Sequence, residues 1–180
     1  MTDTSLLPAD IVALAARVIA ENAAIGRKVA VAESCTGGLV CAALTEIAGS
    51  SAVLGSGFIT YSNEAKNRQL SVPADIIDTF GAVSVACAWA MAQGALKHSD
   101  ADVSVAISGI AGPDGGSAQK PVGLVVFARA ERGSDEVLAE ERHFEPVSRA
   151  SVRADAARMA LELLLPVAKV EEAPEDAPSE

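Results

Sequence analysis

Short apolar segments alternate in this chain with longer segments of helical periodicity, and this alternation restricts the fold to a small set. Five segments have the length and composition of strands: 29–32, 58–61, 103–108, 122–130 and 137–144. The first, Val-Ala-Val-Ala, is the continuous apolar run of a strand buried on both faces. Strands that alternate with helices predict an α/β sandwich. Because the last two strands can pair as a hairpin, we expect a mixed sheet.

The intervening segments place apolar residues three and four positions apart, as helices with one buried face do. They cover residues 8–22, 39–48, 63–69, 73–81, 84–97 and 148–165. The length of the chain suits one domain, which we place at residues 1–165. From Pro166 the composition changes to acidic residues among Ala and Pro, so residues 166–180 are predicted to form an acidic, disordered tail.

Charge and composition narrow the classes of function. The 180 residues include 24 acidic and 14 basic side chains, a formal charge of −10, whereas nucleic-acid-binding domains present a basic face. Without a membrane-spanning stretch or a secretory signal, the chain is expected to be cytoplasmic, with no nucleic-acid or membrane partner. Two histidines and three cysteines without C-x-x-C spacing predict no metal site and no disulfide. We further expect a homo-oligomer that uses no cofactor.

Three segments have residue types that suit chemistry better than structure. The first, residues 33–38 (ESCTGG), joins a buried strand to a helix, and α/β sheets bind ligands at the carboxyl ends of strands. Ser34 would stand on a tight turn as a nucleophile, with N–H groups near Thr36 and Gly37 free to hold an oxyanion. A helix cap formed by Ser34 or Thr36, or a cradle for phosphate, suits the same pattern.

The second segment contains Tyr61, the only tyrosine, and Lys66. Tyr61 is expected at the end of the second strand, on the same edge of the sheet as Ser34. A serine needs a base to act as a nucleophile, and a lysine in a poorly solvated pocket can lose its proton near neutral pH. A solvated helix lysine and a half-buried core tyrosine would explain the same residues.

The third segment is the Gly-rich loop 109–116. Its glycines let the backbone approach a ligand, and successive N–H groups can hold an anion, although a mobile surface loop has the same composition. Ser108 and Asp114 are the side chains expected to meet a ligand there. Arg149 and Arg153, four residues apart on the last helix, either bind a phosphate group or belong to a solvated face.

Taken together, these segments resemble the CinA carboxy-terminal-domain family over residues 8 to 165. The matching motifs are, in order, residues 32–38 (AESCTGG), 48–51 (AGSS), 61–66 (YSNEAK), 81–84 (GAVS), 108–116 (SGIAGPDGG) and 120–123 (KPVG). Family members often have Gly-Asp-Arg before the last helix, where this chain has Val147-Ser148-Arg149. Longer members also have an amino-terminal domain that resembles molybdopterin-binding proteins. We expect this chain to be the stand-alone form.

The resemblance implies a three-layer α/β/α sandwich with a mixed central sheet, like anticodon-binding domains. It also implies a nicotinamide-nucleotide amidase, which hydrolyses the carboxamide of nicotinamide mononucleotide to nicotinate mononucleotide and ammonia in pyridine-nucleotide salvage. Position by position, it assigns Ser34 as the nucleophile, Lys66 as its base and Tyr61 as the tyrosine beside them. The expected substrate contacts are Thr36, Gly37, Gly38, Ser108, Gly109, Arg149 and Arg153.

Two other functions fit the same motifs. A binding or regulatory module associated with competence or DNA damage would keep the motifs without turnover. An amidase for another small amide would keep the chemistry and change the substrate. Release of ammonia from nicotinamide mononucleotide by the purified protein distinguishes these functions.

Overall fold

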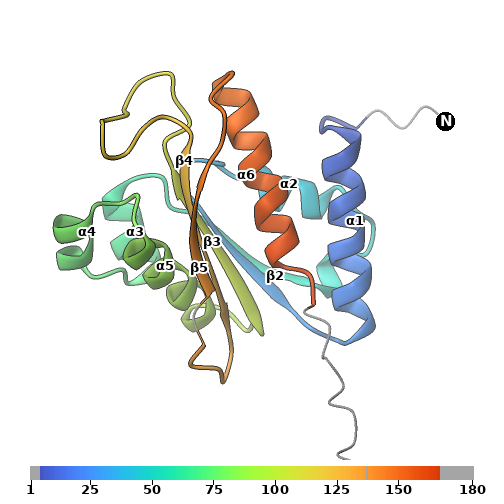
Figure 1. The fold of residues 1–180 in the computed structure, drawn as a ribbon. Coiled ribbons are helices and arrows are strands. Elements are labelled where there is room, and N and C mark those ends of the chain that lie inside the picture. Colours follow the sequence, from blue (N-terminus) through green and yellow to red (C-terminus); the bar gives the residue numbers. More distant parts are fainter. Residues whose placement is uncertain (1–4, 137, 167–180) are drawn as a thin grey trace, which may run out of the picture.

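A single mixed sheet of five strands lies at the centre of the described residues, 5–136 and 138–166 of the computed structural model (Figure 1). The strands are β1 (Val29–Glu33), β2 (Leu54–Ile59), β3 (Val103–Gly109), β4 (Leu124–Glu131) and β5 (Leu138–His143). Their order across the sheet is β2-β1-β3-β4-β5. β1 pairs in parallel with β2 and β3, whereas β4 pairs antiparallel with β3 and β5. The predicted mixed sheet and its hairpin are confirmed.

Six α-helices in the same described residues cover the two faces of the sheet. One face is covered by α1 (Ala9–Ala24), α2 (Leu39–Thr45) and α6 (Arg149–Leu163), the other by α3 (Asn63–Leu70), α4 (Ala74–Phe80) and α5 (Val85–Lys97) (Figure 1). Alternate residues of β1 belong to the two cores: Val29 and Val31 to the first, Ala30 and Ala32 to the second. The three-layer α/β/α sandwich is therefore confirmed.

Two predicted boundaries were wrong. The second strand occupies Leu54–Ile59 rather than residues 58–61, so Tyr61 lies beyond its end. The start of this strand was missed because it contains Gly55 and Gly57, and glycine is depleted in strands. The pairing with β1 overrides that preference. α2 ends at Thr45 instead of reaching residue 48. Residues 167–180 lie outside the described residues, and they make up nearly all of the predicted tail. Val137 also lies outside the described residues.

The strand order places a topological switch point at the carboxyl ends of the three parallel strands. β1 lies between β2 and β3, and the helices that follow β1 and β2 cover opposite faces. Ligands of open α/β sheets bind at such a switch point. Glu33 is in register with Ile59 and with Ile107. The segments that follow these three residues therefore leave the sheet at one edge.

Gly94 allows α3, which contains Lys66, to pack closely on α5. A Cβ at this position would overlap the main-chain oxygen of Leu70 and lie 2.8 Å from the Leu70 Cβ. Alanine normally stabilises a helix by about 1 kcal/mol relative to glycine. Here we expect the clash to prevail, so that Gly94→Ala lowers the free energy of unfolding by about 1–3 kcal/mol. Urea denaturation measures the change, with Lys97→Ala on the same helix as a near-neutral control; an unchanged midpoint for Gly94→Ala would contradict this packing.

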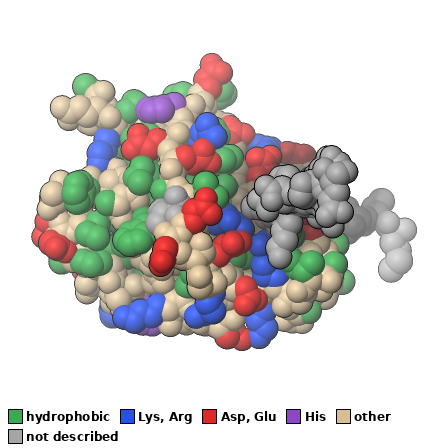
Figure 2. Space-filling model, turned by 60° about the horizontal axis from the view of Figure 1, so that its bottom comes forward, with side chains coloured by type: hydrophobic (Ala, Val, Ile, Leu, Met, Phe, Trp, Pro, Cys, Tyr) green, Lys and Arg blue, Asp and Glu red, His purple; other side chains and the backbone are tan. Residues whose placement is uncertain are grey.

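Figure 2 shows how side chains of each type are distributed over one face of the molecule. On the face drawn in Figure 2, acidic and basic side chains are interspersed, and hydrophobic side chains gather on the side formed by α3, α4 and α5. Exposed hydrophobic residues of α4 and α5 include Phe80, Val85 and Trp89. None of the helices in the described part of the chain has the length and hydropathy required to cross a membrane.

Candidate active site

The fold brings Ser34 and Lys66 together, although they are 32 residues apart in the sequence. Ser34 directly follows β1, and Lys66 lies in the first turn of α3. The Lys66 Nζ is 3.0 Å from the Ser34 Oγ and donates a hydrogen bond of 2.8 Å to the main-chain oxygen of Thr60. Lys66 is 1% exposed and Ser34 is 8% exposed. A hydroxyl and an amine at this distance have the geometry of a nucleophile and its base.

Burial controls the charge of this lysine. Desolvation lowers the pKa of Lys66 from its ordinary value of 10.5, and the nearby Cys87 and Cys35 oppose this shift. None of the ion pairs among the described residues includes Lys66. The first turn of α3 is held by Ser62, whose hydroxyl accepts a hydrogen bond from the Ala65 N–H. Burial thus makes the neutral amine, the form that can accept a proton, easier to reach than in a free lysine.

The turn after Ser34 is organised by Glu33, a residue that the sequence analysis did not single out. Its carboxylate is fully buried and accepts hydrogen bonds from the N–H groups of Gly38, Val40 and Cys41 at 2.9, 3.2 and 2.9 Å. The turn is possible because Gly37 and Gly38 have φ of 61° and 95°, in the left-handed region that glycine favours. An acidic residue at the end of an apolar buried strand was the signal that could have revealed this role.

This network corrects two predictions. Neither Ser34 nor Thr36 caps α2: the Thr36 hydroxyl has no hydrogen-bond partner among the described residues, and Glu33 accepts the N–H groups of the first turn. The Gly37 N–H is also not free, because it donates to the Ser34 main-chain oxygen. Within the described chain, the N–H groups of Cys35 and Thr36 have no such partner. They are the donors left in this turn.

Ser34 and Lys66 line a small cavity of about 210 Å³. The other lining residues are Cys35, Tyr61, Asn63, Ala82, Val83, Ser108, Gly109, Ala111 and Arg149. The predicted contacts Ser108 and Gly109 therefore belong to this cavity, whereas Thr36, Gly37, Gly38, Arg153 and Asp114 do not line it. The Ser108 hydroxyl donates a 2.7 Å hydrogen bond to the main-chain oxygen of Ala82, so it holds the wall of the cavity.

A larger hollow of about 580 Å³ lies between α3 and α4 and shares only Asn63 with this cavity. Its lining residues do not include Ser34 or Lys66. We therefore assign the chemistry to the smaller cavity.

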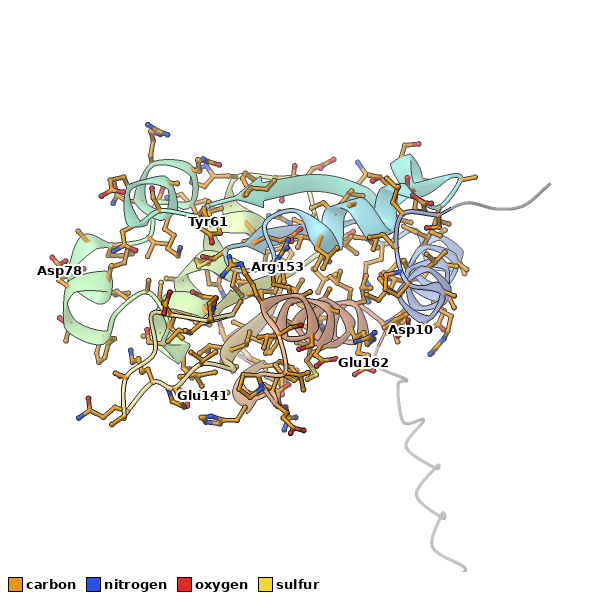
Figure 3. The ribbon with its side chains drawn as sticks, turned by 90° about the horizontal axis from the view of Figure 1, so that it is seen from above. Asp10, Tyr61, Asp78, Glu141, Arg153 and Glu162 are labelled. Carbon is orange, nitrogen blue, oxygen red and sulfur yellow. The ribbon has the colours of Figure 1, made fainter. Side chains whose placement is uncertain are left out.

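Tyr61 and Arg149 of α6 line the smaller cavity, and Arg153 lies one turn further along α6. The Arg149 guanidinium donates to the Tyr61 hydroxyl at 2.9 Å and to the main-chain oxygen of Gly112 at 2.8 Å, which ties α6 to the Gly-rich loop. Arg153 donates to the main-chain oxygen of Thr36 at 2.7 Å. Figure 3 looks down on this end of the molecule and labels Tyr61 and Arg153. Tyr61 is 60% exposed, so it is not the half-buried core tyrosine of the alternative interpretation.

Cys35 is the thiol next to Ser34. Burial raises the pKa of this thiol to about 11. Because the thiolate is the nucleophilic form of cysteine, Cys35 is poorly suited to attack a substrate at neutral pH. Among the described residues, no group of three or more His, Cys, Asp or Glu side chains is arranged to hold a metal ion.

Thr60 contacts Lys66 through its main-chain oxygen and not through its hydroxyl. Its hydroxyl is buried without a hydrogen-bond partner among the described residues. For Thr60→Val we expect the free energy of unfolding to stay within about 1 kcal/mol of the wild type or to rise. Thermal denaturation checks this expectation, and a marked loss of stability would mean that the hydroxyl has a partner.

Comparisons with known proteins bear on this site. The family model described as "CinA C-terminal domain" matches residues 11–168. A protein of Enterobacter agglomerans named "Nicotinamide-nucleotide amidohydrolase PncC" is 49% identical over 134 residues, which cover 74% of this chain and 80% of that protein. A "CinA-like protein" of Citrifermentans bemidjiense is 52% identical over 109 residues, which cover 61% of this chain and 26% of that protein. The chain spans about a quarter to a third of the length of such longer relatives.

A solved structure has the same fold. The crystal structure of the competence/damage inducible protein CihA from Agrobacterium tumefaciens matches with a TM-score of 0.87 at 51% sequence identity. The match covers 89% of this chain and 97% of that chain.

Proposed function

Because this chain belongs to the CinA C-terminal domain family, we propose that it is an amidase that hydrolyses the carboxamide of nicotinamide mononucleotide. The products would be nicotinate mononucleotide and ammonia, which places the reaction in pyridine-nucleotide salvage. The observation that carries this proposal is the 3.0 Å contact between the buried Lys66 Nζ and the Ser34 Oγ. The name of the Enterobacter agglomerans relative, a nicotinamide-nucleotide amidohydrolase, supports the choice of substrate.

The geometry supports attack by Ser34. The neutral amine of Lys66 takes the hydroxyl proton as the Ser34 Oγ bonds to the carboxamide carbon. The carbonyl oxygen gains the negative charge, and the free N–H groups of Cys35 and Thr36 are the donors proposed to hold it. The N–H of the residue after the nucleophile often has this role, and removal of one such donor costs about 10²–10³ in turnover.

The second half of the reaction returns the enzyme to its starting state. The ammonium group of Lys66 gives its proton to the amide nitrogen, the carbon–nitrogen bond breaks and ammonia leaves. A water molecule then attacks the acyl-enzyme, and its proton passes through Lys66 as Ser34 is released. The Tyr61 hydroxyl is hydrogen-bonded to Arg149 rather than to Lys66. We therefore propose that Tyr61 shapes the rim and does not relay the proton.

The size of the cavity bears on how the substrate lies. At about 210 Å³, the cavity is smaller than the roughly 300–1,000 Å³ of pockets that enclose drug-sized ligands. The pyridine carboxamide would occupy it, and the ribose phosphate would extend past Tyr61. Arg149 lines the cavity beside Tyr61, and Arg153 follows one turn later on α6; guanidinium groups bind phosphate well.

Removal of Arg149 tests this orientation. We expect Arg149→Gln to raise KM for nicotinamide mononucleotide about tenfold, the loss of one exposed charged contact, with a smaller change in kcat. Steady-state kinetics with nicotinamide riboside, which lacks the phosphate, provides the control, because its KM should not change. Equal losses for both substrates would mean that Arg149 acts only through the Tyr61 and Gly112 contacts.

The assay of the proposal is direct. Purified protein is mixed with nicotinamide mononucleotide, ammonia is measured with a coupled enzyme, and nicotinate mononucleotide is measured by chromatography, with Ser34→Ala as the blank. Stoichiometric formation of both products supports the proposed reaction. Faster turnover of another amide would revise the substrate. Binding of nicotinamide mononucleotide without hydrolysis of it or of another small amide would refute the proposed amidase activity. It would favour a binding or regulatory module.

A further inference from the structure

We propose that Glu33 is a positioning residue that shapes the oxyanion site and aligns the Ser34–Lys66 pair. The inference rests on the proposed serine mechanism and adds a residue to it. Glu33 touches neither reacting group through its carboxylate. It acts on Ser34 through the turn and on Lys66 through Thr60.

The side chain of Glu33 determines which N–H groups of the turn are free. Its carboxylate takes the N–H groups of Gly38, Val40 and Cys41. A charged acceptor fully buried beside three donors is strongly held, because hydrogen bonds to charged groups are stronger than those between neutral groups. The start of α2 therefore has no donors left for a substrate. The developing negative charge must go to the donors nearest Ser34.

The main chain of Glu33 connects the same residue to Lys66. The Glu33 carbonyl oxygen accepts a 2.8 Å hydrogen bond from the Thr60 N–H. The Thr60 carbonyl oxygen in turn accepts the 2.8 Å hydrogen bond from the Lys66 Nζ. One buried residue thus holds both the turn of the nucleophile and the segment that orients its base. A small displacement of either group matters, because about 1 Å of misplacement can cost 10²-fold in rate.

Glutamine at position 33 has nearly the same shape but lacks the second acceptor oxygen. Its NH₂ group would face N–H donors that the carboxylate now satisfies, and a buried donor without an acceptor costs about 1–3 kcal/mol. The turn would have to move to relieve this conflict. Glu33→Gln therefore tests positioning. A second variant is needed to show what a loss of stability by itself does to the rates.

Asn22 provides the matched control. It is also fully buried, and its amide donates to the main-chain oxygens of Val18 and Leu164. Its main-chain oxygen accepts from the Arg27 N–H, so it lies near the amino end of β1, whereas Ser34 follows the carboxyl end. Asn22→Ala should lose comparable stability without touching the turn. Comparison of the two variants at a temperature well below both melting transitions separates a general loss of stability from a local effect.

Three measurements decide the proposal. The first is steady-state turnover of nicotinamide mononucleotide. The second is the rate at which a fluorophosphonate labels Ser34, measured by mass spectrometry of the intact protein. In that reaction the Oγ–phosphorus bond forms, the phosphorus–fluorine bond breaks, fluoride leaves and Lys66 takes the proton, so no amide substrate is required. The third is hydrogen exchange of the Gly38, Val40 and Cys41 amides.

For Glu33→Gln we expect kcat and the labelling rate to fall about 10- to 100-fold with KM within about threefold of the wild type. The three amides should exchange faster, and Asn22→Ala should keep both rates. Wild-type rates in Glu33→Gln, or equal losses in the two variants, would overturn the proposal and leave Glu33 as a structural cap. If the wild type labels but does not hydrolyse nicotinamide mononucleotide, the proposed substrate fails and labelling still decides the role of Glu33. If the wild type does neither, the serine mechanism and the role of Glu33 fail together.

Discussion

Ser34→Ala should reduce amide hydrolysis by at least about 10³-fold and leave the fold intact. The variant removes the atom proposed to bond to the carboxamide carbon, and nothing else in the cavity replaces it. Its cost in stability should be about 1 kcal/mol, because the Lys66 Nζ keeps its hydrogen bond to Thr60. Ammonia release and thermal denaturation measure the two effects.

Cys35→Ala is the matched control, since it changes the adjacent residue in the same cavity. Burial raises the pKa of the Cys35 thiol to about 11, so little thiolate is present at neutral pH. Removal of the thiol should therefore reduce turnover far less than removal of the Ser34 hydroxyl. An inactive Cys35→Ala together with an active Ser34→Ala would reverse the assignment of the nucleophile.

Lys66→Arg should be nearly as inactive as Ser34→Ala, although it keeps a positive charge. A guanidinium does not lose its proton in this pH range and cannot accept one from a serine. Lys66→Met should be equally inactive and should bind substrate about as well as the wild type. Substantial turnover by Lys66→Arg would show that position 66 requires only charge, and a different base would then have to be found.

The pH profile of the wild type tests the same role. Because desolvation lowers the pKa of Lys66, the amine loses its proton at a lower pH than a free lysine does. We expect kcat/KM to rise with pH through this lowered pKa and then to level off. A profile without this rise would contradict general-base catalysis by Lys66.

Stability gives a check that does not depend on activity. Between the lowered pKa of Lys66 and its ordinary value of 10.5, the unfolded chain binds a proton that the folded chain does not. The contribution of Lys66 to the free energy of unfolding therefore rises with pH across this window. The cysteines act in the opposite direction near pH 9 to 11, since burial raises the pKa of Cys35 from 9.0 to about 11. The difference between the wild type and Lys66→Met removes their effect, and a flat difference would contradict a lowered pKa.

The sequence by itself determined the layers and the edge at which the site lies. The apolar run of β1 is buried on both faces as predicted, because hydrophobic pattern reflects the faces that a strand must bury. The segment of Tyr61 and Lys66 was placed at the same edge as Ser34, because ligands of open α/β sheets bind at the carboxyl ends of strands. These are properties of local pattern and of strand direction, and they need no knowledge of packing.

The tertiary structure alone decided which atoms of that edge meet. The bounds of β2 depend on its pairing with β1, which overrides the weak strand preference of Gly55 and Gly57. The lowered pKa of Lys66 depends on desolvation as α3 packs on α5. The role of Glu33 depends on a turn in which Gly37 and Gly38 bring N–H groups five to eight residues away to its carboxylate. Hydrogen bonds and desolvation arise from distances between segments, and sequence spacing does not contain those distances.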